Sequence, residues 1–255
     1  LFHIGIWFVI TKPEVFEKNL QHTFYNTGRD GHFLFYQTAV LKSVLKRHKP
    51  KLIIYDVAGS FIYDESDYDR LSSLLPYYDN HTEIRNIVNL RSRYEPIKNL
   101  SNLYPYNSTI ANIIIGNLKV EGIRSKEIQG YVPLHGQLLD KIQKHASVFP
   151  YETDSEKIDV FNQFLNLCQQ NKIPLVVVMS PVYYTYEKDY SLELYKNICD
   201  ENKIQFFDFT RNNDFLDNPH FFDDISHLND KGASLFSKKI ANLVKNRLKD
   251  NHTIN

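Results

Sequence analysis

The sequence predicts an α/β domain built on a doubly wound parallel sheet, and three observations carry this prediction. Segments typical of strands and of helices alternate at both ends of the chain. The clearest strands, 52–57 and 174–179, are almost continuously apolar, as parallel strands covered on both faces are. Turn-forming residues follow each of them directly. In such a sheet, ligands bind beyond the carboxyl ends of the strands.

Four apolar runs are expected to form the buried strands, because they show little polar alternation. They are 1–10, which Gly5 interrupts, 52–57, 174–179 and 204–209. A shorter β-prone run at 23–26 ends in a turn whose residues tolerate positive φ. Four residues follow expected strands and should therefore lie at one edge of the sheet, namely Gly31, Ser60, Ser180 and Asp224.

Helices are expected where apolar residues recur every three or four positions. Segments 33–48, 158–168 and 191–202 carry such stripes, and 13–19 is a further candidate. Thr153 to Glu156 offers a capping box to the second of these helices. A last helix follows Asn229 or Asp230, either of which can cap it, and its buried stripe is Ala233, Phe236, Ile240, Leu243 and Val244.

Residues from about 64 to 150 break the alternation of strands and helices. Their apolar spacing is helical, as in Ile84, Ile87, Val88 and Leu90. We therefore expect one domain, 1–255, with a mostly helical insertion at about 64–150 that covers the site or forms an interface.

Composition excludes several classes of protein. The 255 residues suffice for one sizeable core, and 42% hydrophobic with 24% charged residues is ordinary for a globular domain. The formal net charge is zero and no basic block occurs, so nucleic acid is not an expected partner. No run approaches the ~18 apolar residues of a membrane span. Cys168 and Cys199 lie on apolar helix faces, where buried free thiols are favoured over a disulfide.

The most informative stretch is 223–232, where Asp224 precedes His227 by three residues. One short loop can then present a carboxylate and an imidazole together. A carboxylate bonded to one ring nitrogen fixes the tautomer and leaves the other nitrogen as a base. An isolated pair of this kind is more often a helix cap beside a surface histidine, but the capped amphipathic helix that follows favours the catalytic interpretation.

The residues Asp224-x-x-His227-Leu-Asn-Asp-x-Gly resemble the last conserved block of the SGNH (GDSL-type) hydrolases, which have a flavodoxin-like, three-layer α/β fold. The resemblance implies a serine esterase in which Asp224 orients His227, and His227 acts first as general base and then as general acid. It implies oxyanion donors at the Gly31 N–H and at Ser60, which stands where the family has asparagine. It implies no metal and no cofactor.

The chain departs from the family at the nucleophile. The family places serine two residues after a glycine behind the first strand, whereas here Gly5 is followed by Ile6 and Trp7. Thr11 is the only hydroxyl nearby. Three explanations stay open: a degenerate family member, a nucleophile from elsewhere such as Ser180, or an N-terminal sequence altered relative to a functional parent. The first and third are favoured.

We therefore expect an ester hydrolase acting on a small-molecule or glycan ester, with a carbohydrate O-acyl group as the first candidate. This choice rests on family habit and on the aromatic loop 182–186. The alternatives are a degenerate glycan-binding or accessory protein on the same scaffold, and an O-acyltransferase relative. From the family resemblance, and because the chain starts at Leu1 with Met179 as its only methionine, we expect a processed, exported protein, periplasmic or extracellular. The histidines and acids of 220–227 are less favoured as a metal site, and the oligomeric state is not indicated.

Overall fold

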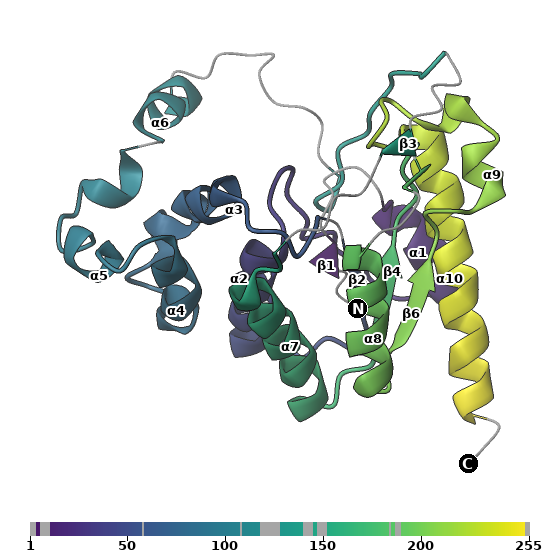
Figure 1. Cartoon of the computed structure of the whole chain (residues 1–255), viewed down its shortest axis with the longest axis horizontal. Coiled ribbons are helices and arrows are strands. Elements are labelled where there is room, and N and C mark those ends of the chain that lie inside the picture. The colour runs from purple at the N-terminus through teal and green to yellow at the C-terminus, as the bar shows by residue number, and fades with distance from the viewer. Residues whose placement is uncertain are drawn as a thin grey trace.

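The computed structural model describes residues 4–5, 11–57, 59–107, 109–117, 128–139, 145–146, 152–183, 185–186 and 190–252. Within them, four parallel strands form one sheet in the order β1-β2-β4-β6, and helices flank it on both sides (Figure 1). The strands are β1 (Ile4–Gly5), β2 (Ile53–Asp56), β4 (Leu175–Met179) and β6 (Gln205–Asp208). The predicted parallel α/β sheet is confirmed.

The strands are paired in register along the sheet. Ile53 lies opposite Leu175 in the β2–β4 pair, and Val176 lies opposite Gln205 in the β4–β6 pair. Every residue of β2 and β4 is buried, whereas β6 at the edge is partly exposed. Because all pairs are parallel, the carboxyl ends of the strands lie along one edge, where Asp56 ends β2.

Helices on one face of the sheet enclose the larger of two hydrophobic clusters. These helices are α2 (Leu34–Arg47), α7 (Ser155–Gln170) and α8 (Tyr190–Glu201). Side chains of a strand alternate between its two faces, so Tyr55 and Val177 point into this cluster. The ring of Tyr55 stacks on that of Phe164, with 4.1 Å between the ring centroids.

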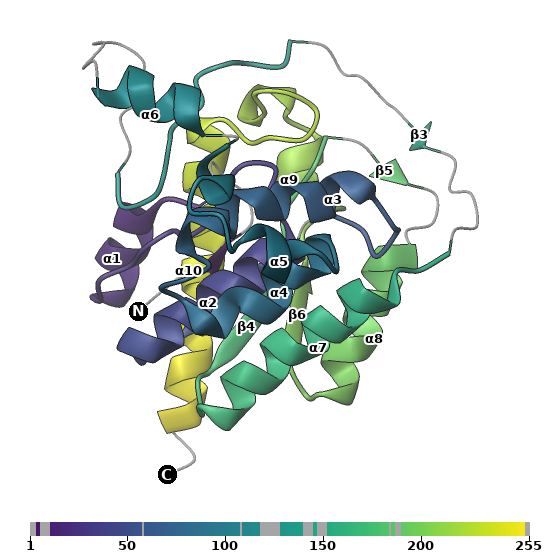
Figure 2. The same cartoon turned by 90° about the vertical axis from the view of Figure 1, so that its left-hand side faces the viewer.

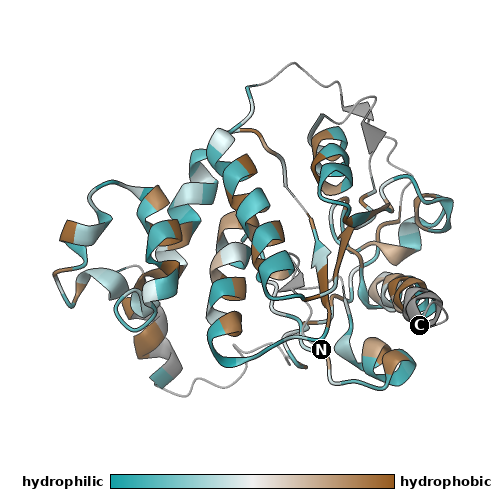
Figure 3. Cartoon of the chain, turned by 90° about the horizontal axis from the view of Figure 1, so that it is seen from below, coloured by the Kyte–Doolittle hydropathy of each residue, from teal (hydrophilic) through white to brown (hydrophobic). Residues whose placement is uncertain are grey.

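The opposite face is covered by α1 (Pro13–Leu20) and α10 (Asp230–His252), which pack on Ile54, Val176 and Val178. Figure 1 shows α10 running along the full height of the sheet on this side. Figure 3, coloured by the hydropathy of each residue, shows largely hydrophobic strands in the centre. The flanking helices carry both hydrophobic and hydrophilic residues.

Local sequence sets the ends of these helices. Asp154 caps α7 by accepting hydrogen bonds from the backbone N–H groups of Glu156 (3.0 Å) and Lys157 (3.4 Å). At the C-terminal end of α1, Gln21 adopts a left-handed conformation with φ of 55° and terminates the helix. Cys168 and Cys199 are buried and free, as predicted.

The β-prone run 23–26 forms no strand of the described sheets, and only Asn26 within it is a β-bridge residue. The backbone N–H of Phe24 donates to the side chain of Glu17 (3.0 Å), and that of Asn26 donates to the carbonyl of Gln129 (3.0 Å). The run is extended, but a helix side chain and a loop take its hydrogen bonds. For the expected strand 1–10, the described strand is Ile4–Gly5, and 1–3 and 6–10 lie outside the described residues.

Residues 65–107 and 109–117 form short helices and turns on the side of the molecule where α2 lies, away from α10 (Figures 1 and 2). Leu71, Ile87 and Val88 are buried in the same cluster as α2, which joins this part to the core. The limits of the expected insertion stay a prediction. The elements are α3 (Glu65–Asp69), η1 (Arg70–Tyr77), η2 (Thr82–Ile84), α4 (Arg85–Val88), η3 (Asn89–Arg91), α5 (Glu95–Lys98), η4 (Tyr104–Tyr106) and α6 (Ile110–Asn117).

The remaining elements are short. β3 (His145–Ala146) pairs in parallel with β5 (Thr185–Tyr186), and α9 (Asn213–Leu216) and η5 (Pro219–Phe221) precede α10. Among the described residues, no helix combines the length and the apolar character needed to cross a membrane.

Replacement of Phe164 by alanine should lower the free energy of unfolding by about 3–5 kcal/mol, because it leaves a cavity beside Tyr55 in the main core. Urea unfolding followed by circular dichroism measures the change. Leu103→Ala is the control, since that side chain is 72% exposed and its loss should cost less than about 0.5 kcal/mol. Equal effects of the two substitutions would contradict the assignment of the core.

Candidate active site

Asp224 and His227 lie on the loop between η5 and α10. Both carboxylate oxygens of Asp224 approach His227 Nδ1, Oδ1 at 2.9 Å and Oδ2 at 2.8 Å. Oδ1 also accepts hydrogen bonds from the backbone N–H groups of Ser226 (2.7 Å) and His227 (2.9 Å). The carboxylate therefore closes the turn and holds the imidazole at once. The hydrogen bond expected from the spacing is present, and the catalytic roles stay predictions.

The surroundings of Asp224 favour its ionised form. Partial burial acts to raise the pKa of Asp224, but the Ser226 N–H and the His227 ring outweigh it and leave the pKa below its ordinary value. A carboxylate at Nδ1 favours the tautomer with the proton on that nitrogen, which makes Nε2 the basic atom. The Asp224 and His227 side chains are 52% and 23% exposed, so water or an ester can approach the pair.

Asn229 fixes the loop that carries the dyad of Asp224 and His227, here called the dyad loop, to its surroundings. Its side-chain Oδ1 accepts from the backbone N–H groups of Lys231 and Gly232, both at 3.1 Å, and so caps α10. Its Nδ2 donates to the carbonyls of His220 (2.8 Å) and Gly136 (3.1 Å). One buried amide thus joins the helix, the loop that precedes it and the stretch 128–139.

Asp230, the next residue, forms a second anchor. Its carboxylate accepts from the hydroxyl of Tyr131 (2.8 Å) and pairs with Lys12 Nζ (2.9 Å). Burial acts to raise the pKa of Asp230, but the hydrogen bond from Lys12 contributes most to leaving it below its ordinary value. The backbone N–H of Lys12 donates to Ser237 Oγ of α10 (2.8 Å). The chain just after the expected nucleophile segment is therefore held against the first turns of α10.

The loop after β4 contacts the dyad loop directly. The backbone N–H of Tyr183 donates to the carbonyl of Ile225 (2.8 Å), and the ring of Tyr183 packs on Phe222 at 5.1 Å between centroids. Part of the aromatic loop 182–186 is thus adjacent to the dyad. Ser180, the alternative nucleophile, lies at the start of this loop and is buried.

A buried acid at the sheet edge was missed in the sequence analysis. Asp56 ends β2, and its Oδ1 accepts from the backbone N–H of Ser180 (3.0 Å). Its Oδ2 has no hydrogen-bond partner among the described residues. Burial raises the pKa of Asp56 to about 8, although hydrogen bonds from Ser180 act against this shift. The signal was available, since Asp56 is the only charged residue in the apolar run 52–57.

Gly31 and Ser60, the expected oxyanion donors, both lie near the side chain of Arg70. Gly31 has φ of +66°, and a Cβ there would lie 3.6 Å from the guanidinium carbon of Arg70. Ser60 lines a pocket of about 10 Å³, room for one water molecule, together with His32, Arg70 and Lys157. The structure thus brings both positions to Arg70. That they lie beside His227 stays a prediction.

Arg70 and Lys157 could not be found from a motif. Lys157 is buried on α7, and its Nζ donates to the carbonyl of Ile62 and to Asp67 Oδ2, both at 2.6 Å. Arg70 lies over the ring of Phe33, 5.4 Å from its centroid. These contacts join residues far apart in the sequence, which explains why local pattern does not indicate them.

Two sequence expectations fall on the N-terminal segment. Ile6 and Trp7, at the family's nucleophile block, lie outside the described residues. Thr11 is described and buried, and Asn26 Nδ2 donates to its carbonyl (3.3 Å). Thr11 is therefore enclosed rather than presented to a substrate.

The residues considered for a metal make other contacts. Gln137 contacts His220 through Nδ1, and the backbone N–H of Gly136 donates to Asp223. In the part of the chain that the structure describes, no group of three or more histidines, cysteines and acids is placed to hold a metal ion.

Comparisons with known proteins give one distant likeness. No protein-family profile matches the chain, and no curated protein matches it. A solved structure that superimposes on it is that of a Bacteroides fragilis protein provisionally assigned as an acylhydrolase. The TM-score is 0.46 and the identity 12%, over 98% of this chain and 86% of that chain. A likeness at this level does not establish a shared family or activity.

Asp56→Asn should change how stability depends on pH. The pKa of Asp56 is about 8 in the folded chain and near 4 in the unfolded chain, so the folded state binds more protons between these values. The wild-type chain should therefore lose stability as pH rises from about 4 to about 8, by an amount on the order of a few kcal/mol. The variant lacks this loss.

Urea unfolding of both chains at about pH 5 and pH 8 measures the difference. Asp79→Asn serves as the control, because Asp79 is exposed and distant in sequence from the site. Parallel pH profiles for wild type and Asp56→Asn would contradict the raised pKa.

Proposed function

We propose that this chain hydrolyses ester bonds, with His227 as general base and Asp224 as the carboxylate that orients it. The observation that supports this most is the placement of both Asp224 oxygens within 2.9 Å of His227 Nδ1 on a solvent-accessible loop. A helix cap alone requires hydrogen bonds to backbone N–H groups. It does not require an imidazole held by the same carboxylate.

The proposed reaction follows from this geometry. His227 Nε2 takes the proton of the attacking hydroxyl, and Asp224 stabilises the imidazolium that forms. The new C–O bond gives a tetrahedral oxyanion, for which the Gly31 N–H and the Ser60 hydroxyl are the proposed donors. As the ester C–O bond breaks, His227 returns the proton to the leaving oxygen. With Trp7 at the family's serine position, the attacking hydroxyl in this chain is that of water.

The finer assignment is also a proposal. Membership of the SGNH hydrolases rests on the block around Asp224 and His227. A carbohydrate O-acyl substrate is proposed from the family resemblance and from the aromatic loop 182–186, in which Tyr183 contacts the loop of Asp224 and His227. An exported location is proposed from the family resemblance.

A second candidate is a glycan-binding protein without catalysis on the same scaffold. The observation that favours it is the substitution of the family's catalytic positions, with Trp7 for serine and Ser60 for asparagine. Both candidates use the same edge of the sheet, and they differ in whether His227 contributes to turnover.

Hydrolysis of an aryl acetate should be slow and should depend on His227. Since no serine stands at the first block, we expect a rate at most about 10³–10⁴ above water, the residual level of a triad that has lost a member. His227→Ala should lower this rate by removing the contribution of the general base. His22→Ala, at an exposed histidine, should leave the rate unchanged.

Treatment with a serine-directed phosphonate, followed by mass spectrometry, tests the water mechanism. We expect no adduct on Ser180. An adduct on Ser180 with rapid turnover would overturn the choice of nucleophile, whereas equal rates for wild type and His227→Ala would reject the hydrolase and leave the binding protein.

A further inference from the structure

Ser73 and His32 form a hydrogen-bonded pair that no sequence motif indicates. His32 lies on the turn before α2, and Ser73 lies on η1, 41 residues further along the chain. His32 Nε2 is 2.9 Å from Ser73 Oγ, and His32 Nδ1 is 2.7 Å from the backbone carbonyl oxygen of Asp30. An imidazole is therefore placed between a serine hydroxyl and an acceptor that orients the ring, which is the arrangement of an activated serine nucleophile.

The carbonyl of Asp30 decides which ring nitrogen carries the proton. A carbonyl oxygen only accepts hydrogen bonds, so the proton lies on His32 Nδ1 and is donated to Asp30. In the neutral ring Nε2 is then unprotonated, and its contact with Ser73 requires the serine hydroxyl to be the donor. The proton of Ser73 is thus directed at the basic nitrogen of His32.

The surroundings of His32 favour its neutral form. Burial lowers the pKa of His32 below its ordinary value, and the charges of Arg29 and Arg70 lower it further. The hydrogen bond to the Asp30 carbonyl and the charge of Asp30 act in the opposite direction without outweighing them. The ring of Tyr36 packs edge-on against His32, with 4.9 Å between the ring centroids. The imidazole is therefore both oriented and able to accept a proton at Nε2.

η1 presents Ser73 on the side that faces away from the core. Leu71, Leu74 and Leu75 of η1 are buried in the main hydrophobic cluster. Residues three apart are aligned in a helix with three residues per turn, so the remaining side of η1 carries Arg70 and Ser73. Both Ser73 and His32 are only partly buried, which leaves the pair accessible to a small molecule.

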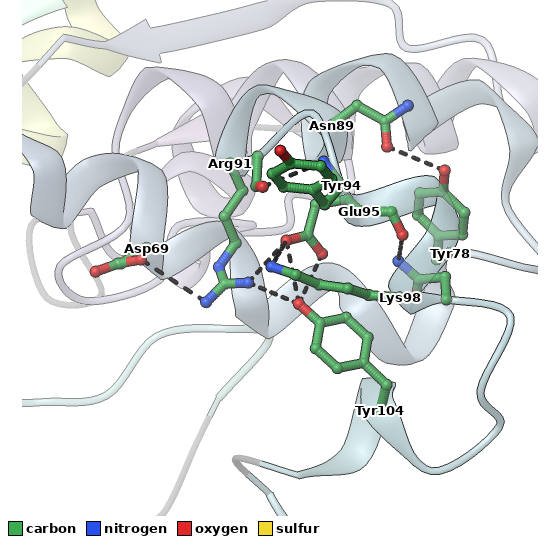
Figure 4. A network of polar contacts seen from close by, with 10 residues as sticks. Asp69, Tyr78, Asn89, Arg91, Tyr94, Glu95, Lys98 and Tyr104 are labelled. Atoms are coloured by element: carbon green, nitrogen blue, oxygen red, sulfur yellow. Dashed lines mark hydrogen bonds and ion pairs between the residues drawn. The ribbon is translucent and has the colours of Figure 1, made fainter.

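Contacts at both ends of η1 fix it to the neighbouring helices (Figure 4). Asp69, which precedes η1, pairs with Arg91 at 3.7 Å, and Arg91 is held in turn by the buried Glu95 at 2.9 Å. The hydroxyl of Tyr78, which follows η1, donates to Asn89 Oδ1 (3.0 Å). Ser73 therefore lies on a helix that is held by its core side and at both ends, as a preorganised nucleophile requires.

Arg70 places a guanidinium group beside this pair. A Cβ on Gly31 would lie 3.6 Å from Arg70 Nε and 3.9 Å from Nη2, so this edge of the guanidinium is turned toward the loop that carries His32. The other edge, at Nη1, pairs with Asp67 at 3.4 Å. The edge with Nε and Nη2 has the charge and the N–H groups that stabilise an oxyanion.

We propose that Ser73 and His32 form a second acyl-transfer centre, in which Ser73 is the nucleophile, His32 its base and Arg70 the group that stabilises the oxyanion. Ser73 Oγ attacks the ester carbonyl carbon as its proton moves to His32 Nε2. The ester C–O bond then breaks, the leaving oxygen takes that proton, and the acyl group remains on Ser73. Water attacks this acyl group in the same way, gives its proton to Nε2, and releases the acid as Ser73 recovers its proton.

The space beside the pair indicates the class of substrate. The pocket that His32 and Arg70 line has a volume of about 10 Å³, which is room for one water molecule and too little for an acyl chain. The centre therefore suits esters with a short acyl group, such as an aryl acetate. Neither Asp224 nor His227 enters the reaction, so this activity goes beyond the hydrolysis proposed for the dyad and does not depend on it.

Labelling of the full chain with the serine-directed phosphonate tests the proposal. Mass spectrometry should map an adduct to Ser73 and none to Ser72, the neighbouring serine of η1, which is the internal control. His32→Gln, which removes the base but keeps a polar side chain, should slow the labelling of Ser73 about 10²-fold or more. His227→Ala should leave the labelling rate unchanged. Circular dichroism verifies that both variants are folded.

The pH dependence of labelling distinguishes a base from a structural bridge. The rate at Ser73 should rise with pH and level off, with a midpoint below the ordinary histidine pKa of about 6.5, because only neutral His32 accepts the proton. Absence of a Ser73 adduct in the wild-type chain, or a labelling rate that His32→Gln leaves unchanged, would overturn the proposal. Neither result bears on the dyad, whose contribution is measured separately by aryl acetate turnover in His227→Ala.

Discussion

Burial of β2 and β4 on both faces is the constraint on which the rest of this structure depends. Neither strand exposes a residue, so each face of the sheet needs its own layer of helices. The α2, α7 and α8 helices supply one layer, and α1 and α10 the other. Because the strands are parallel, their carboxyl ends and the loops that follow them lie along one edge of the sheet. Asp56 lies at this edge, at the end of β2, and accepts a hydrogen bond from the backbone N–H of Ser180. The loop that begins at Ser180 then contacts the loop of Asp224 and His227 through Tyr183.

The elements that the sequence predicts well are those whose signal is local. The apolar runs 52–57 and 174–179 and the stripe of α10 follow directly from periodicity, and Asn229 is one of the two caps expected. The β-prone run 23–26 forms no strand of the described sheets, because Glu17 and Gln129 take its hydrogen bonds, which its β propensity does not show. Two other contacts depend on how the chain folds between residues 65 and 107, which residue spacing does not predict. They are the contact of Lys157 with Asp67 and the position of Arg70 beside Gly31.

The candidate site divides in the same way. Asp224 and His227 are brought together by a turn that the Asp224 carboxylate itself closes, so three residues of spacing are enough to predict their contact. A nucleophile and oxyanion donors must come from other strands, and their position depends on the whole sheet. Of the proposed catalytic roles, that of His227 as general base therefore has the most support.

The central claim is that Asp224 holds His227 as a base, and the tautomer of His227 tests it most directly. Long-range ¹H–¹⁵N correlation spectra of the chain labelled at histidine nitrogen distinguish a proton on Nδ1 from a proton on Nε2. At a pH where the ring is neutral, the account predicts the proton on Nδ1, and it predicts that Asp224→Asn removes this preference. A proton on Nε2 in the wild-type chain, or a preference that Asp224→Asn leaves unchanged, would contradict it.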